Sequence, residues 1–360
     1  MKKLLNVLLI PVFAFIMPVR ARAAPENAVS ESVDVESVEN AVPDSAQEII
    51  GNSDTEDTEI FSKIWGYVRE NGGKEVRRAL SGASKVLCVA VLCAFGCALF
   101  EDKAKYMITA SVCAVAAITV SDAASFLTTG RETINELSAF SKILLPTLAS
   151  SAALSGAYTS AAAKCAVSSF FIDILITLGA KFAVPVILAY LAACIGNAAT
   201  TGGGLSAVTG LLKWVSVTFL TGLVIVFTCF LSITGIVSGT ADAAASRIAK
   251  TAISTALPVV GGVISDAAGA VAAGAGTVKN TIGVFGMAVT LAVIAVPFLR
   301  IGAAYLAYKA AAGLSACISD TRISGLLSNI GTAFGMVLGL IGACAVMLFI
   351  SVIIAMKGVT

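Results

Sequence analysis

From about Val86 to its C-terminus, this chain is too apolar to fold in water. Hydrophobic residues make up 58% of the sequence, and charged residues make up only 13%. A soluble domain of this length cannot bury that much apolar surface. The sequence therefore predicts an all-α fold, a polytopic bundle of roughly six to eight transmembrane helices surrounded by membrane lipid.

Short motifs in the apolar region recur in the same order. Leu-Pro, Ala-Val-Pro, Ala-Tyr-Leu-Ala and Gly-Leu-Leu begin at positions 145, 183, 189 and 210, and again at positions 257, 295, 304 and 325. This order predicts an internal duplication, with repeat-like units at about residues 144–237 and 256–352. The small-residue segments of these units, 146–163 and 258–278, are then the expected discontinuous elements that line a pathway.

The N-terminus is typical of a secretory signal followed by an acidic arm. Residues 1–23 combine two lysines, an apolar run and Ala-Arg-Ala, the three parts of a cleavable signal peptide. Residues 24–59 contain no aromatic residue and carry half of the 22 acidic residues of the chain. Such a stretch buries too little to order itself, so we expect a disordered extracytoplasmic arm. A docking arm for an extracytoplasmic partner is the alternative.

The remaining sequence divides into a juxtamembrane segment and a membrane domain. Residues 60–85 mix apolar and aromatic side chains with six basic residues, which is typical of an amphipathic helix among the lipid headgroups. The multi-pass membrane domain is expected over residues 86–360. Within it, residues 121–142 are polar enough to lie on the surface of the membrane, and residues 309–328 are amphipathic.

Charged residues within the apolar regions are candidate pathway or buried polar positions. A lone carboxylate in hydrocarbon costs about 2.5 to 3.5 kcal/mol on insertion scales, so it requires a partner, a water-filled cavity or a proton. Asp173 is the strongest candidate, because large apolar residues surround it in the sequence. The other candidates are Lys181, Asp266, Lys279 and Arg300. The alternative for these charges is a place near a helix end, from which they reach the interface.

A glycine stripe predicts a helix–helix contact. Gly331, Gly335 and Gly339 form two overlapping G-x-x-x-G motifs on one helix face. Glycines at this spacing let two membrane helices approach closely. The contact lies either within one protomer or between the copies of a homo-oligomer.

Catalytic chemistry finds little support in this composition. The chain has no histidine, which removes the commonest general base and the commonest metal ligand. Its nine cysteines include no C-x-x-C pair, and no glycine-rich nucleotide fingerprint occurs. We therefore expect no enzyme, no catalytic residue, no cofactor, no metal and no nucleic acid partner.

Several motifs of the C-terminal half resemble a known family. They are Ala-Leu-Pro-Val-Val-Gly-Gly-Val-Ile-Ser-Asp at 256–266, Thr-Val-Lys-Asn at 277–280, Gly-Val-Phe-Gly at 283–286 and Ala-Val-Pro-Phe-Leu-Arg at 295–300. Together with the Leu-Leu-Pro at 144–146, they are similar to the stage III sporulation protein AE family of endospore-forming bacteria, over about residues 60–356. The glycine that follows an aspartate in that family is absent here, since Ala243 follows Asp242.

The resemblance implies a multi-pass protein of the mother-cell membrane that surrounds the forespore. It also implies a place in a channel or secretion-like complex that late forespore development requires. The partners implied are other stage III sporulation proteins, a secretion-type ATPase among them, and stage II sporulation protein Q. The residues alone leave two alternatives open, a stand-alone secondary transporter and a membrane scaffold that recruits extracytoplasmic ring proteins.

Overall fold

The structure is a computed structural model that describes residue 38 and residues 40–50, 57–154, 159–200, 204–233 and 281–357. These residues form helices joined by tight turns, and no strand occurs among them. Six of their helical segments are long and apolar enough to cross a membrane. The predicted all-α polytopic bundle is therefore confirmed, and the described residues alone supply six of the six to eight expected spans.

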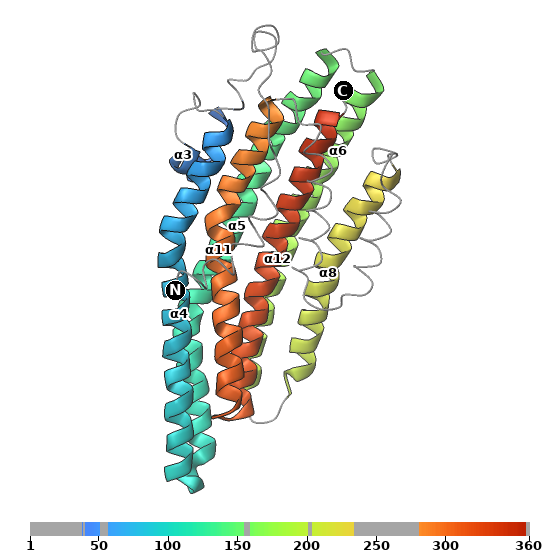
Figure 1. Cartoon of the computed structure of the whole chain (residues 1–360). Coiled ribbons are helices and arrows are strands. Elements are labelled where there is room, and N and C mark those ends of the chain that lie inside the picture. The colour runs from blue at the N-terminus through green and yellow to red at the C-terminus, as the bar shows by residue number, and fades with distance from the viewer. Residues whose placement is uncertain are drawn as a thin grey trace.

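The helices run up and down the bundle in chain order (Figure 1). Their bounds are α3 Asp44–Ile50, α4 Asp57–Leu99, η1 Glu101–Lys103, α5 Ala104–Leu154, α6 Thr159–Leu178, η2 Gly179–Ala183, α7 Val184–Ala199, α8 Ser206–Ile233, α11 Thr281–Ala316 and α12 Thr321–Lys357.

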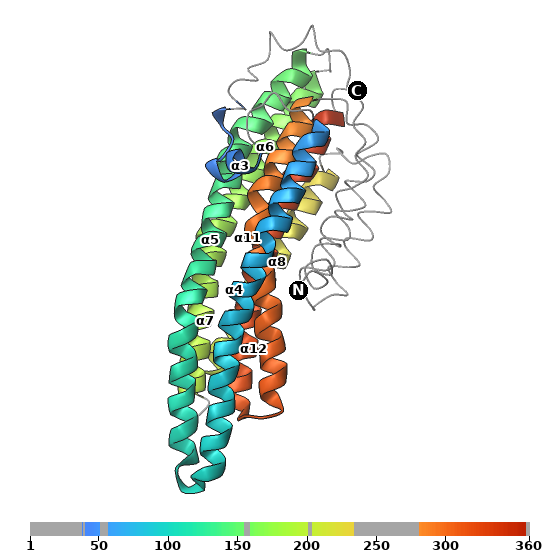
Figure 2. The same ribbon diagram turned by 60° about the vertical axis from the view of Figure 1, so that its left-hand side comes forward.

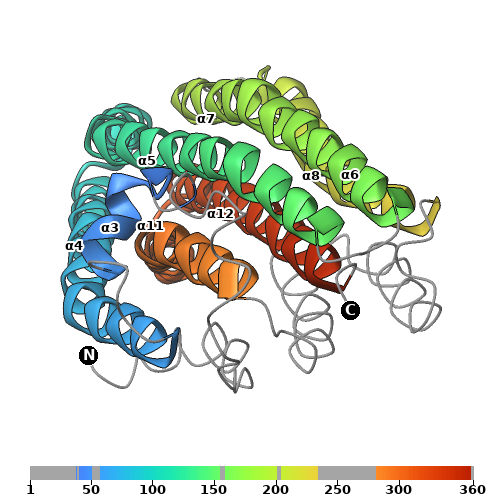
Figure 3. The same cartoon turned by 90° about the horizontal axis from the view of Figure 1, so that it is seen from above.

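Helices α11 and α12 form the centre of the described bundle. Seen from above, α4 and α5 lie on one side of this pair, and α6, α7 and α8 lie beyond α5 and α12 (Figure 3). The protein buries 78% of the most apolar stretch of α12 but only 28% of that of α8. Phe334 of α12 meets Phe126 of α5 and Tyr308 of α11 edge to face, with ring centroids 4.8 and 5.2 Å apart. The hydrophobic core thus follows α12.

Helices α4 and α5 are much longer than a membrane requires. They contain 43 and 51 residues. At 1.5 Å per residue these helices are about 65 and about 75 Å long, whereas the hydrocarbon core of a bilayer is only about 30 Å thick. The turn that joins them, η1, extends beyond the α11–α12 turn in two different views (Figures 1 and 2). The α4–α5 hairpin therefore reaches past the rest of the bundle.

Two segments that the sequence predicts on the membrane surface are parts of these long helices. Residues 60–85 continue directly into the first apolar span within α4, and residues 121–142 lie in the middle of α5. Ile60, Ile64 and Val68 are at most 2% exposed, so one face of the upper part of α4 is packed against the bundle. Apolar residues every fourth position give α4 one apolar face, although its opposite face is charged.

The expected disordered arm, residues 24–59, contains a packed helix. Helix α3 buries Ala46, Ile49 and Ile50, which the i, i+3, i+4 spacing brings to one face. The Ser45 hydroxyl donates a hydrogen bond to Glu136 of α5 at 2.6 Å. An aliphatic face of a few residues is enough here because α4 and α11 supply the surface that covers it. The predicted signal peptide, residues 1–23, lies outside the described residues.

The long apolar segment around Pro185 is one continuous helix with a wide turn. Helix α6 passes through the π-helical turn η2 into α7, and Pro185 lies at the start of α7. Proline has no N–H, so it cannot bond the carbonyl of residue 181 and its ring crowds that carbonyl. A π-turn directly before the proline absorbs this conflict without a break in the helix.

The internal duplication stays a prediction. Most of the start of its second unit, including the small-residue segment 258–278, lies outside the described residues. In the first unit, the matching segment begins as the last turns of α5, with Pro146 inside that helix. The tyrosines of the two Ala-Tyr-Leu-Ala motifs, Tyr190 and Tyr305, both contact α12.

Candidate functional site

Arg300 of α11 is held by polar groups from α4 and α5. Its Nη2 donates to Ser125 Oγ at 2.8 Å, and its Nη1 donates to Thr129 Oγ1 at 3.4 Å. Its Nε lies 3.5 Å from Glu75 Oε2, and its guanidinium stands 5.4 Å from the ring centroid of Phe126. We name Glu75, Ser125, Phe126, Thr129 and Arg300 the Arg300 cluster.

The Arg300 cluster joins three helices at one depth. The Glu75 side chain is only 13% exposed and Arg300 is 29% exposed, so their ion pair is partly shielded from solvent. Glu75 also accepts a hydrogen bond from Arg78 at 2.8 Å. A charge shielded from water destabilises the folded protein unless an opposite charge pairs with it. Glu75 and Arg300 therefore each compensate the charge of the other. Two turns away, Tyr308 of α11 donates to Asp122 of α5 at 3.2 Å.

Asp173 of α6 has a partner on α5. The Lys142 ammonium lies 3.3 Å from its Oδ1, and the Ser138 hydroxyl donates to the same oxygen at 3.1 Å. The pair is moderately open, because Lys142 is 55% and Asp173 29% exposed. Of the possibilities that the sequence raises for this carboxylate, the structure supplies the charged partner.

Lys181 lies on the wide turn η2 and is exposed. It has neither an ion-pair nor a hydrogen-bond partner among the described residues. The structure therefore does not bring Lys181 to Asp173. Asp266 and Lys279 lie outside the described residues.

Lys309 of α11 makes a half-buried polar contact that the sequence did not single out. Its ammonium donates to the Ser328 carbonyl at 2.9 Å, to Ser328 Oγ at 3.1 Å and to Thr332 Oγ1 at 2.8 Å. On the other side of α12, Tyr190 of α7 donates to Asn329 Oδ1 at 3.2 Å. The signal that could have revealed Lys309 is its spacing, because it follows Tyr305 by one helical turn.

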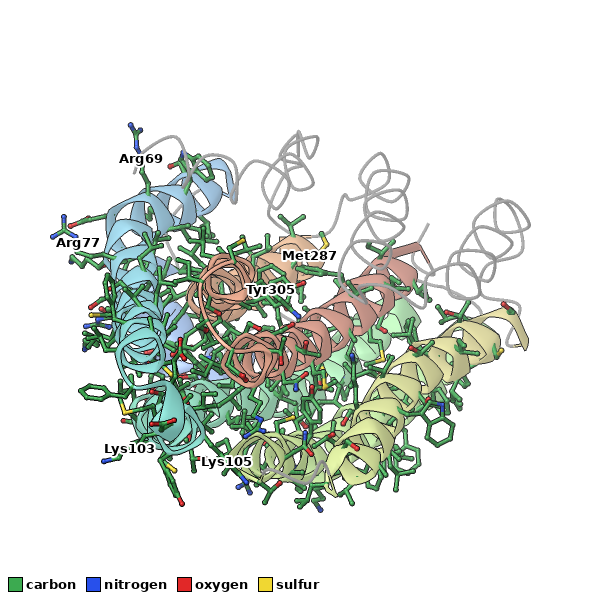
Figure 4. All side chains as sticks on the ribbon, turned by 90° about the horizontal axis from the view of Figure 1, so that it is seen from below. Arg69, Arg77, Lys103, Lys105, Met287 and Tyr305 are labelled. Carbon is green, nitrogen blue, oxygen red and sulfur yellow. The ribbon has the colours of Figure 1, made fainter. Side chains whose placement is uncertain are left out.

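The glycine stripe of α12 faces α11. A Cβ at Gly331 would lie 3.2 Å from the stem of Lys309, and one at Gly335 would lie 2.9 Å from the ring of Tyr305. Figure 4 shows Tyr305 inside the bundle, between α11 and α12. Gly339 is buried in the same helix. Gly331 and Gly335 thus serve a contact within one protomer.

A comparison with protein-family models decides the identity. The model of stage III sporulation protein AE matches residues 42–358. The chain belongs to the stage III sporulation protein AE family. A search of curated proteins and a search of solved structures each gave no match. The family predicted from the sequence motifs is thereby confirmed. The six apolar helices of the described residues indicate a multi-pass membrane protein.

The family match extends further towards the N-terminus than the resemblance predicted. It begins at residue 42, whereas the motifs indicated about residue 60. The stage III sporulation protein AE model therefore includes α3, the helix that packs on α4, α5 and α11. Helix α3 is thus part of the family's fold.

Among the residues that the structure describes, no group of three or more cysteine, aspartate or glutamate side chains could hold a metal ion. Cys93 and Cys97 approach each other, with their sulfur atoms 4.0 Å apart, but only these two thiols meet. The polar contacts of this AE family member link helices to one another.

Proposed function

We propose that this AE family protein is a membrane subunit of a channel or secretion-like complex that spans the envelope between mother cell and forespore. Late forespore development would depend on it. Its partners would be other stage III sporulation proteins, including a secretion-type ATPase, and stage II sporulation protein Q. The ATPase would supply the energy, and the present chain would form part of the wall of the conduit.

The depth of α4 in the bundle supports this proposal. The Glu75–Arg300 ion pair and the closeness of Gly82 to Tyr308 align α4 with α11. Residues 69–78 of α4 therefore lie beside residues 294–303 of α11. In that stretch Gly302 packs against Leu338 of α12, near the middle of an apolar span that runs from Thr321 to Ile354. This part of α4 is thus level with the middle of the apolar core.

The outer side of α4 is charged at this depth. Its exposed charged residues are Arg69, Glu70, Lys74, Arg77 and Arg78, which we name the α4 charged face. Arg69 and Arg77 point away from the bundle (Figure 4). One charge at the centre of a bilayer costs about 2.5 to 3.5 kcal/mol on insertion scales, so five cannot face lipid tails. Water in a conduit is the environment that suits them.

The opposite side of the protein behaves differently at the same depth. Leu223 of α8 and Leu340 of α12 both lie against Gly179, which aligns these helices. Val226, one turn further along α8, is 47% exposed, and the neighbouring Ile225 is 41% exposed. An exposed apolar surface at this depth is what lipid tails require. The single observation that carries the proposal is this difference between α4 and α8.

A thiol-accessibility experiment tests the proposal. In a variant without the nine native cysteines, Arg77→Cys and Val226→Cys are compared in sporulating cells with a membrane-impermeant maleimide. We expect modification at position 77 and none at position 226. Equal modification of the two positions would contradict an aqueous face on α4. Substrate flux through liposomes that contain this chain alone would contradict a subunit role and would favour a stand-alone transporter.

A second measurement tests the biological role. Arg69→Ala combined with Arg77→Ala removes positive charge from the α4 charged face without a change in the buried side of α4. We expect expression of a late forespore reporter to fall, while the matched Ile225→Ala/Val226→Ala variant keeps it. Unchanged expression in the arginine variant, at equal protein level, would count against a conduit wall on α4.

A further inference from the structure

Lys181 is a cation in the middle of an apolar surface. It lies 14 residues from the start and 18 from the end of the span Val167–Ala199, which places it about 21 and about 27 Å from the two ends. In a hydrocarbon core of about 30 Å, a residue at mid-depth is about 15 Å from either interface, which is beyond the reach of a lysine side chain. Its exposed neighbours Leu178 and Phe182 are apolar. An unpaired charge in this position requires a carboxylate partner, and the described residues of the same chain supply none.

Glu132 of α5 is an exposed carboxylate without a partner among the described residues. It is two residues beyond Gly130, which lies against Val337 of α12. Lys181 is two residues beyond Gly179, which lies against Leu340 of the same helix. Because Val337 and Leu340 are one turn apart, Lys181 and Glu132 lie at the same depth to within about 5 Å.

The two charges lie on different sides of the protomer. Glu132 shares a face of α5 with Glu136, one turn later, and Glu136 accepts the hydrogen bond from α3. Lys181 belongs to the η2 turn, which packs on α8. In the view from above, α3 and α8 lie on different sides of α5 (Figure 3). The two side chains therefore cannot satisfy each other within one copy.

We infer that Lys181 of one copy pairs with Glu132 of a second copy of this chain. Copies related by rotation about the membrane normal keep every residue at its depth, so a lysine on one side meets a glutamate on the other side of its neighbour. Such a head-to-tail contact repeats around a closed ring. The pairing satisfies both intramembrane charges, which no partner among the described residues does.

Cross-linking between two differently tagged copies tests this interface. Both copies lack the native cysteines; one carries Lys181→Cys and the other carries Glu132→Cys. We expect a disulfide-linked dimer that bears both tags. The matched control replaces the second change by Ile143→Cys, an exposed position of the same helix that lies about 16 Å higher, and it should give no such dimer. Failure of the Lys181–Glu132 pair to cross-link would overturn the inference.

Charge exchange gives an independent readout that needs no transport. We expect Lys181→Glu alone and Glu132→Lys alone to lower the oligomeric mass in lipid nanodiscs, and the double exchange to restore it. Unchanged mass in both single variants, or a wild-type monomer, would overturn the inference. So would a cross-link from Lys181→Cys to a different protein and not to this chain. Because mass is measured, the result stands apart from the proposed conduit.

Discussion

The α4–α5 hairpin and the α11–α12 hairpin are built alike but differ in the charges they carry at mid-depth. Each consists of two long antiparallel helices joined by a short turn. At mid-depth the α11–α12 pair carries a single charge, Arg300, and most of its surface is covered by protein. At the same depth, α4 exposes five charges on its outer side. Arg300 faces α4 and pairs with Glu75. The only mid-depth charge of the α11–α12 hairpin therefore lies at its contact with the α4–α5 hairpin.

The difference shows that apolar length alone does not define how a membrane helix is used. In α12 the apolar residues fill the core around Phe334 and Leu340, whereas between residues 60 and 79 of α4 the buried apolar residues form a single stripe. A stripe is enough to pack a helix into the bundle and leaves its other face free for water or a partner. Substitutions in the two hairpins can separate the contribution of charge pairs from that of apolar packing.

Loss of the Arg300 ion pair should have the largest effect on stability. Arg300→Met leaves Glu75, which is 13% exposed, with Arg78 as its remaining cation. Removal of one partner of a fully buried pair costs about 3 to 5 kcal/mol. Arg300 is 29% exposed and Arg78 still pairs with Glu75, so the cost here should lie below that range. We expect a clear fall of the melting temperature in detergent. Melting is measured by the fluorescence of a thiol-reactive dye that labels the core cysteines as they become exposed.

The matched controls separate charge from packing. Arg78 is 72% exposed, so Arg78→Met should cost less than about 1 kcal/mol. The double variant Glu75→Gln/Arg300→Met should recover part of the loss, because it also removes the partly buried carboxylate charge that Arg300 had helped to neutralise. Equal destabilisation by Arg300→Met and Arg78→Met would show that the boundary between the hairpins is not an ionic one.

An added methyl group within the α11–α12 hairpin should have an intermediate effect. Gly335→Ala places a Cβ 2.9 Å from the Tyr305 ring, whereas Gly325→Ala in the same helix meets nothing within 4 Å. Overpacking of a core contact costs about 1 to 3 kcal/mol. Alanine at the open position should stabilise by about 0.5 to 1 kcal/mol through its helix propensity. Detergent melting curves of the two variants should therefore shift in opposite directions.

The pair between Asp173 and Lys142 should matter least for stability. Lys142 is 55% exposed and Asp173 29% exposed. Pairs this open contribute about 0 to 1 kcal/mol, so we expect Asp173→Asn to melt close to the wild type. Sporulation should also stay close to normal if the carboxylate acts only as a partner of Lys142. A strong sporulation defect in a normally folded Asp173→Asn protein would make it a pathway residue.

The sequence predicted the class of fold and the family because both depend on local patterns. Apolar spans, proline positions and the Val-Gly-Gly run are visible without any knowledge of neighbours. The role of Glu75 was not visible, since its charge looks like any other on a juxtamembrane helix until Arg300 is placed opposite it. The same holds for Lys142, which lies 31 residues before Asp173 and reaches it only because α5 and α6 pack together.

The sequence also underestimated how far order extends. Composition predicts disorder for residues 24–59, because the acidic residues outweigh the few aliphatic ones. Composition does not register that Ala46, Ile49 and Ile50 share one face and that α4 and α11 offer a surface to cover them. Whether a short segment folds is decided by such a surface, and this information lies elsewhere in the chain.

The wide turn η2 marks a point in the chain where deletion of one residue can be tolerated. A π-turn holds one residue more than the regular helix around it needs. In a sequence without Pro185, loss of a single residue between Gly179 and Ala183 would leave an ordinary helix whose two halves still face α5 and α12. The same deletion elsewhere in the helix would rotate all that follows by about 100° and carry Tyr190 away from Asn329. Single-residue gaps between relatives should therefore gather at this turn.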